Sequence, residues 1–130
     1  MHTYEKLITV ALDDLDELNH VNNVRYVQWI NDIAKEHWYQ NASQEMLNDF
    51  IWVVIKHCIQ YKGAAFLNDV LKLRTYVSFS EGVTSMRIVE IYNISTDKLL
   101  VKSEINFCLI NKRNNRPTRI PDNILNLFSK

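Results

Sequence analysis

The sequence predicts an α+β fold in which one long helix packs against a curled antiparallel sheet. Hydrophobic residues recur with helical spacing over about residues 23–39, and after Phe50 the spacing changes to two residues. Turn-forming residues separate the later segments at short intervals, as is typical of antiparallel strands. We therefore expect one long central helix wrapped by a five-stranded antiparallel sheet.

The first strand is expected over residues 4–12, where Ile8, Val10 and Leu12 alternate onto one face. The long helix follows, with Asn22 or Asn23 as its cap, and a short helix is expected near residues 43–48. Other structure should wrap most of the long helix, because only a narrow stripe of it is polar. Its apolar positions are Val24, Val27, Ile30, Ile33, Ala34 and Trp38.

The second half of the chain predicts four more strands with short connections. The expected strands cover residues 51–62, 69–80, 83–95 and 99–112. Turn chemistry between them predicts a meander, in which each strand pairs with the next. Because long edge strands are rarely left open, we expect a homodimer, or a homotetramer.

Composition excludes several classes of protein. The 130 residues predict a single domain spanning 1–130, and 15 basic residues balance 15 acidic ones, so a nucleic-acid partner is not expected. No apolar run reaches the roughly 18 residues of a membrane span, and the N-terminus shows no signal peptide, so we expect no membrane partner and a cytoplasmic location. Cys58 and Cys108 have no metal-ligand spacing and are expected to be buried, reduced thiols.

The segment from Asp16 to Tyr26 places a carboxylate, an imidazole and two amides just before the long helix. An acid at this point can lie beside free backbone N–H groups, where a polarised carbonyl binds. That combination suits acyl transfer. Asp16 could instead only complement the helix dipole, and spacing alone does not choose it over Asp13 and Asp14.

The neighbours of Asp16 each have a structural and a functional interpretation. His20 could orient water or the acyl carbonyl, or it could fix the loop through hydrogen bonds. Asn22 and Asn23 can form caps and turns, and the main-chain N–H of Asn23 could also point at a substrate carbonyl. Tyr26 is either a core aromatic with a satisfied hydroxyl or, with Asn22, a substrate contact.

Residues 105–121 contain four basic side chains and no acid. This basic patch is either a solvated loop and tail or a binding site for the phosphates of coenzyme A. The chain has no glycine-rich phosphate loop, serine nucleophile elbow or histidine-rich metal cluster. The patch consists of Lys112, Arg113, Arg116 and Arg119.

Residues 12–29 resemble the D-x-x-G-H-V-N-N-x-x-Y signature of hotdog-fold acyl thioesterases, of the 4-hydroxybenzoyl-CoA and plant acyl-ACP thioesterase kind. Weaker similarity continues through residues 59–61 and 116–121. The resemblance implies a hotdog fold that hydrolyses an acyl-CoA or acyl-ACP thioester at a subunit boundary. It assigns the catalytic carboxylate to Asp16 and the oxyanion-binding N–H to Asn23. No cofactor is implied, since coenzyme A belongs to the substrate.

Some positions depart from this pattern. Leu18 stands where plant-type enzymes have Asn, residues 63–65 lack their second acid, and Asn19 replaces a glycine, which implies a positive φ there. These departures favour a simpler site built around one aspartate. Asp16 would attack the carbonyl, giving a mixed anhydride, or deprotonate a water.

Two other functions compete. A hydratase or dehydratase acting on acyl thioesters also pairs an Asp with a His, but its D-x-N-P-x-H pattern is not found in this chain. A non-catalytic acyl-CoA binder is the second alternative. The carboxylate of Asp16 argues against it, because a pure binder gains little from an acid beside the thioester carbonyl.

Overall fold

The structure is a computed structural model that describes residues 2–129. Its first half contains the strand β1 (Thr3–Thr9), the 3-10 turn η1 (Leu12–Asp14) and the helices α1 (Asn23–Asn41) and α2 (Gln44–Asp49). The second half contains the strands β2 (Phe50–Tyr61), β3 (Val70–Glu81), β4 (Thr84–Asn93), β5 (Lys98–Asn111) and β6 (Arg116–Pro117), and the helix α3 (Asp122–Leu125).

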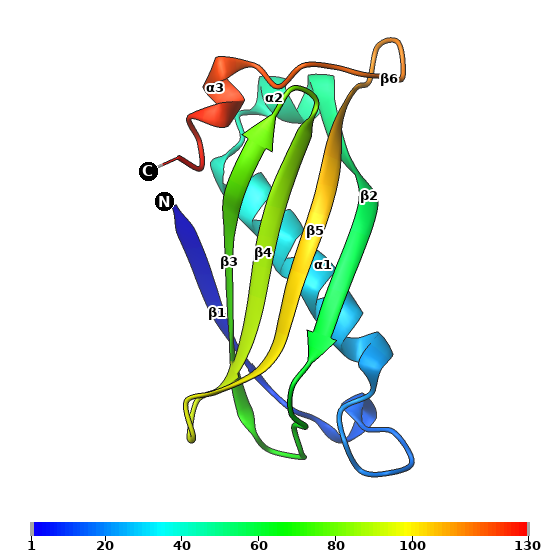
Figure 1. The fold of residues 1–130 in the computed structure, drawn as a ribbon, viewed down its shortest axis with the longest axis vertical. Coiled ribbons are helices and arrows are strands. Elements are labelled where there is room, and N and C mark those ends of the chain that lie inside the picture. Colours follow the sequence, from blue (N-terminus) through cyan, green and yellow to red (C-terminus); the bar gives the residue numbers. More distant parts are fainter. Residues whose placement is uncertain (1, 130) are drawn as a thin grey trace.

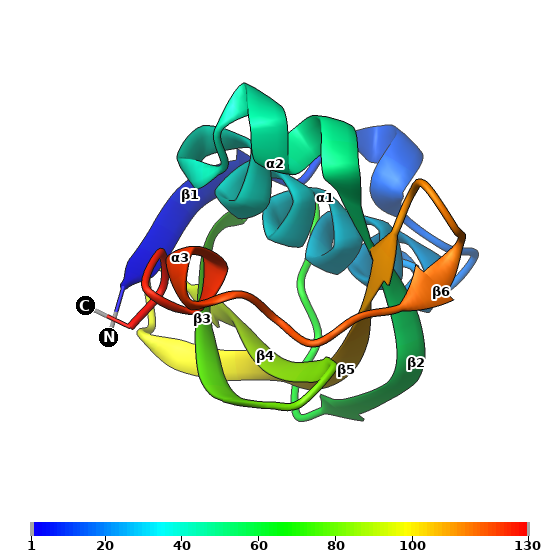
Figure 2. The ribbon, with the colours of Figure 1, turned by 90° about the horizontal axis from the view of Figure 1, so that it is seen from above.

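One antiparallel sheet curls around α1. The strand order is β1-β3-β4-β5-β2, with β6 pairing to β5. Seen from above, the sheet passes beneath α1, and β1 and β2 rise on opposite flanks of the helix (Figure 2). The predicted α+β arrangement of one long helix in a curled antiparallel sheet is confirmed.

Two details of the predicted sheet are wrong. The two-residue β6 adds a sixth strand, and β2 pairs with β5 instead of β3, so only β3, β4 and β5 form a meander. The connection over residues 62–69 carries the chain from one edge of the sheet towards the other, below α1 (Figure 1). This placement lets β2 close the sheet along the second flank of the helix.

The first strand is also shorter than expected. It ends at Thr9, and η1 then turns the chain, which leaves Leu12 71% exposed. Val10 is still buried, because its N–H donates to the carbonyl of Asp69 at 2.9 Å and holds the residue against the core. Cys108 is buried, but Cys58 lies exposed on β2, so the expectation of two buried thiols is wrong for Cys58.

Helix α1 forms because a local cap starts it and one face is buried. The side-chain oxygen of Asn22 accepts from the N–H of Val24 at 3.0 Å, which confirms Asn22 as the N-cap. Val24 itself is 73% exposed, so the helix is covered on its inner side and not around its whole circumference. The buried face consists of Tyr26, Trp29, Ile30, Ile33, Ala34, His37 and Trp38.

The sheet and α1 leave two ends with different surroundings (Figure 1). The lower end carries the loop before α1, the 62–69 connection and the β4–β5 hairpin. The upper end carries α2, the β5–β6 turn and α3. Among residues 2–129, no helix has the length and apolarity needed to cross a membrane.

Candidate active site

Residues 14–22 form a closed loop directly before α1. Leu15 and Val21 pair as an antiparallel bridge, and the N–H of Asp16 donates to the carbonyl of His20 at 2.8 Å. Asn19 has the expected positive φ, 63°, at the tip. These contacts hold Asp16 opposite His20, one residue beyond the bridge.

The carboxylate of Asp16 is fixed through one oxygen only. Its Oδ1 accepts from the N–H of Leu18 at 2.9 Å and from the N–H of His20 at 3.3 Å. No residue of the described chain hydrogen-bonds to Oδ2. The half-buried side chain is thus oriented by its own loop and keeps one oxygen for another molecule.

The other two acids of this segment differ from Asp16. Asp14 accepts from the N–H of Ala11 at 2.8 Å and forms an ion pair with Arg25, with 3.0 Å between Oδ1 and Nε. Both of its oxygens are therefore engaged, Oδ2 within its own turn and Oδ1 with α1. Asp13 is exposed, and its backbone carbonyl accepts from Arg25. Asp16 accepts hydrogen bonds from the N–H groups of its own loop and not from the first turn of α1, so its contacts are not those of a residue that caps the helix.

The first turn of α1 leaves one N–H free. Asn22 occupies the next three, since its side chain accepts from Val24 and its carbonyl accepts from Arg25 at 2.9 Å and from Tyr26 at 3.3 Å. The N–H of Asn23 has no hydrogen-bond partner in residues 2–129. A free N–H at a helix start is a donor suited to a carbonyl that gains negative charge.

The 62–69 connection forms a second wall beside this loop. The N–H of Val21 donates to the carbonyl of Ala65 at 3.0 Å, and the His20 ring meets Phe66 edge to face at 5.1 Å between centroids. The sequence pointed to this segment only through the resemblance, which puts the second acid of plant-type enzymes at residues 63–65; it did not predict that the segment packs beside the Asp16 loop. An apolar rim of exposed side chains surrounds the loop: Leu12, Leu18, Phe66 and Leu67.

Tyr26 lies behind the loop in the core. It is 2% exposed, and its ring packs against Trp29 and Tyr61. Its hydroxyl lies near the Ala65 backbone but makes no hydrogen bond of good geometry with a described residue, so the expectation of a satisfied hydroxyl is wrong. Burial raises the pKa of Tyr26, and the Ala65 backbone lowers it in part.

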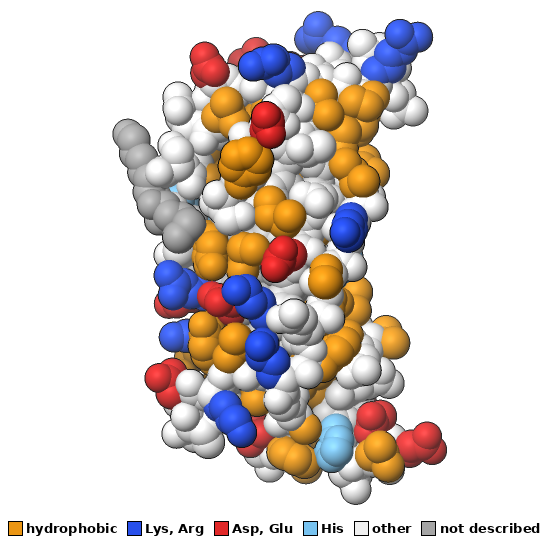
Figure 3. Space-filling view, viewed as in Figure 1, with side chains coloured by type: hydrophobic (Ala, Val, Ile, Leu, Met, Phe, Trp, Pro, Cys, Tyr) orange, Lys and Arg blue, Asp and Glu red, His pale blue; other side chains and the backbone are white. Residues whose placement is uncertain are grey.

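The basic patch lies at the opposite end of the molecule. Lys112 donates to the carbonyl of Leu47 at 2.8 Å, and Arg113 lies 3.4 Å from Asp49, while Arg116 and Arg119 are exposed. Basic side chains also appear at the upper end of the space-filling view (Figure 3). Strand β5 has 14 residues, so it separates the patch from the Asp16 end by about 45 Å along its length.

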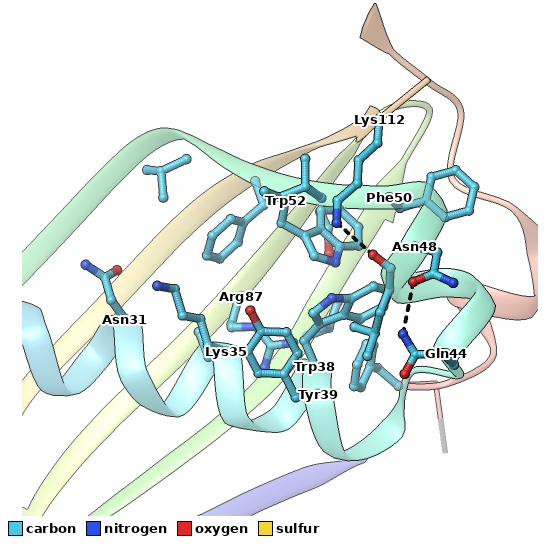
Figure 4. Close-up of a pocket in the computed structure, with 18 residues that line it drawn as sticks. Asn31, Lys35, Trp38, Tyr39, Gln44, Asn48, Phe50, Trp52, Arg87 and Lys112 are labelled. Atoms are coloured by element: carbon cyan, nitrogen blue, oxygen red, sulfur yellow. Dashed lines mark hydrogen bonds between the residues drawn. The ribbon is translucent and has the colours of Figure 1, made fainter. Parts of the chain in front are cut away.

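A cavity of about 630 Å³ lies between α1, α2 and β2, next to the patch (Figure 4). Its walls are aromatic and apolar, with several polar groups among them. Sequence reasoning did not find it, because inward-facing side chains of helices and strands show the same periodicity whether they fill a core or line a cavity. Its aromatic lining consists of Trp38, Tyr39, Phe50, Trp52, Phe107 and Phe128, and its cations are Lys35, Arg87 and Lys112.

The curled antiparallel sheet around one long helix is the fold of the hotdog thioester hydrolases. Residues 1–128 match the family described as the acyl-ACP thioesterase N-terminal domain, and the chain belongs to this family. No curated protein matches the sequence.

Solved structures of several thioesterases share the fold. The probable thioesterase YbaW from Escherichia coli superposes with a TM-score of 0.88 at 21% identity, covering 97% of this chain and 98% of that one. Slr0204, a 1,4-dihydroxy-2-naphthoyl-CoA thioesterase from Synechocystis, gives 0.83 at 15% identity, covering 97% and 95%. The 12:0-ACP thioesterase from Umbellularia californica gives 0.85 at 15% identity, covering 98% of this chain and 51% of that one.

Proposed function

We propose that the protein hydrolyses an acyl-CoA or acyl-ACP thioester at the Asp16 loop. The observation that carries this proposal is the pair of unused groups at the start of α1, the Oδ2 of Asp16 and the N–H of Asn23. The thioester carbonyl oxygen would accept from the Asn23 N–H, which stabilises the charge that develops on it. The Asp16 carboxylate would then act on the carbonyl carbon.

The reaction has two forms that differ in what Asp16 does. As a nucleophile, Asp16 forms an anhydride with the acyl group while the C–S bond breaks, and water then cleaves the anhydride. As a general base, it takes a proton from water, which attacks the carbonyl directly. Both forms yield a free acid and a thiol. Label found in Asp16 after a single turnover in ¹⁸O-labelled water would identify the nucleophilic form, because only the anhydride lets water attack the carboxyl carbon of Asp16.

His20 supports the carboxylate through its main chain. Its N–H donates to Asp16 Oδ1, and its carbonyl accepts the N–H of Asp16. Its imidazole is half-buried against Phe66 and would contact a substrate bound at the loop. We assign His20 to positioning Asp16 and to contact with the thioester.

A homodimer would complete the site. Strand β2 is a 12-residue edge strand that pairs on one side only, and its exposed apolar residues include Ile51, Val53, Val54 and Ile55. Pairing it with β2 of a second copy would remove this open edge. A two-fold axis between the strands makes the pairing antiparallel, so the upper end of one copy would lie beside the lower end of the other.

This geometry gives the basic patch a role. Within one chain the patch is too far from Asp16 to hold the same substrate, but in the antiparallel dimer it would lie near the Asp16 loop of the partner. The phosphates of a coenzyme A substrate, or an acidic carrier protein, would bind there while the acyl group reaches the catalytic loop.

Thiol release tests the proposed activity. The purified protein is incubated with short, long and aromatic acyl-CoAs, and free thiol is measured over time. We expect release proportional to enzyme concentration with at least one acyl class. A folded protein that releases no thiol from any acyl-CoA or acyl-ACP would contradict the proposal.

A further inference from the structure

The cavity beside α1 contains a buried guanidinium. Arg87 projects inward from β4, is 6% exposed and lines the cavity with Trp38 and Trp52 (Figure 4). Its guanidinium lies 5.2 Å from the centroid of the Phe128 ring. Burial lowers the pKa of Arg87 to about 10, so the side chain is positively charged at neutral pH.

No described acid neutralises this charge. The Nη1 of Arg87 donates to His37 Nδ1 at 2.8 Å and to Thr75 Oγ1 at 3.1 Å, and both partners are uncharged. No Asp or Glu of residues 2–129 forms an ion pair with Arg87 or lines the cavity. A buried charge with no opposite charge is costly, which makes this arrangement unusual for a purely structural residue.

The contacts of Arg87 orient its remaining donors. Arginine only donates, so His37 accepts through Nδ1 and carries its proton on Nε2, which then donates to His2 at 2.8 Å. This chain fixes Nη1 in place. Nε and Nη2 have no partner in the described chain, and neither is among its fully enclosed unpaired atoms, so they are open to the cavity.

The remainder of the cavity suits an apolar molecule with a negative end. Its aromatic walls offer apolar contact, and its volume of about 630 Å³ is in the range of small-molecule sites. Lys35 and Lys112 line it along with Arg87, so all three charged residues of its lining are positive.

We infer that this cavity binds an apolar molecule ending in a carboxylate, which accepts two hydrogen bonds from Nε and Nη2 of Arg87. These two N–H groups form one side of the planar guanidinium fork and match the two oxygens of a carboxylate. The inference deepens the proposed function and rests on it for the source of the ligand. Because the cavity lies next to the basic patch, the ligand would come from the Asp16 loop of the partner in the proposed dimer. The carboxylate belongs either to the far end of the acyl group in a dicarboxylic half-thioester or to the free acid product.

Direct binding tests the shared chemistry without turnover. Octanoate and octan-1-ol are titrated into the wild-type protein, with binding measured by calorimetry and by tryptophan fluorescence, to which Trp38 and Trp52 of the cavity wall contribute. We expect octanoate to bind more tightly, and Arg87→Met to weaken octanoate by about 10–100-fold while changing octan-1-ol little. Arg87→Lys should restore part of the preference, because it keeps the charge without the planar fork.

Lys98→Met is the matched control, since Lys98 is an exposed cation on the β4–β5 hairpin, outside the cavity lining. It should bind both ligands as the wild type does. Equal affinity for octanoate and octan-1-ol in the wild type would overturn the inference even if Arg87→Met did not fold. An unchanged preference in a folded Arg87→Met, shown by its melting curve, would do the same.

Kinetics then separate the two sources. If the carboxylate is the far end of the substrate, the half-thioester of octanedioic acid should exceed octanoyl-CoA in kcat/KM, and Arg87→Met should remove that advantage. If it is the product, octanoate should inhibit octanoyl-CoA hydrolysis in an Arg87-dependent manner. The absence of both effects would contradict the inference. Octanoate binding without thiol release would instead refute the proposed function alone.

Discussion

Acid should destabilise this protein through His37. His37 is fully buried between α1 and the sheet, where Arg87, His2, Tyr4 and Phe128 face it and no described acid does. Burial, followed by the charge of Arg87 and the electrostatic influence of the neighbouring His2, lowers the pKa of His37 from 6.5 to about 3. The folded protein therefore keeps this histidine neutral at a pH where the unfolded chain protonates it.

The sign and size follow from proton linkage. Between pH 6.5 and 3 the unfolded chain binds one more proton than the folded protein at this site, so stability is full above pH 6.5 and falls as the pH decreases. The slope approaches about 1.4 kcal/mol per pH unit. At pH 4.5 the loss from His37 is thus roughly 2–3 kcal/mol, or on the order of 10 °C in Tm for a domain of this size.

The comparison of wild type with His37→Gln measures this term. Glutamine can still accept from Arg87, but it does not titrate. Melting curves followed by circular dichroism at pH 7 and at pH 4.5 should show a smaller acid-induced loss in the variant, by about the same 2–3 kcal/mol. His57→Gln is the comparison, because burial also lowers the pKa of half-buried His57 on β2, and this variant should reduce the acid-induced loss by less than His37→Gln does. Equal acid sensitivity in wild type and His37→Gln would refute the argument.

Three other predictions concern the helix cap, the edge strand and the basic patch. Asn22→Ala should lower the free energy of unfolding by about 1 kcal/mol, measured by urea denaturation, because the Val24 N–H loses its cap. Val53→Lys on β2 should give a monomer by light scattering, whereas Leu7→Lys on the other edge strand should not. Alanine substitution at the basic-patch residue that contacts coenzyme A should raise KM for acyl-CoA with little change in kcat, and the rise in KM should be smaller at high salt. If all four alanine variants of the patch match wild type at low salt, coenzyme A binds elsewhere.

Local features of the fold were predictable from the sequence, and non-local pairing was not. The cap at Asn22 and the change of periodicity after Phe50 set the start of α1 and the series of strands within a few residues. The sequence did not predict the pairing of β2 with β5. Turn-forming residues indicate which consecutive strands can pair, but they do not indicate which strand closes the sheet around the helix.

The same distinction holds for the candidate site. Asp16, His20 and Asn23 lie in one short segment, so a sequence motif can identify them. The wall at Ala65 and the cavity around Arg87 come from segments far apart in the chain. The only sequence signal for Arg87 is a charged residue at an inward position of a strand, between Ser85 and Val89.

The most direct test of the proposed mechanism is thiol release by Asp16→Asn. The substitution keeps the size and most hydrogen bonds of the side chain and removes its charge, so the melting curve should change little. Turnover should fall by roughly 10²–10⁴-fold, whereas Asp13→Asn, at an exposed acid of the same segment, should retain most of it. Near-normal turnover in Asp16→Asn, or an equal loss in Asp13→Asn, would contradict the mechanism.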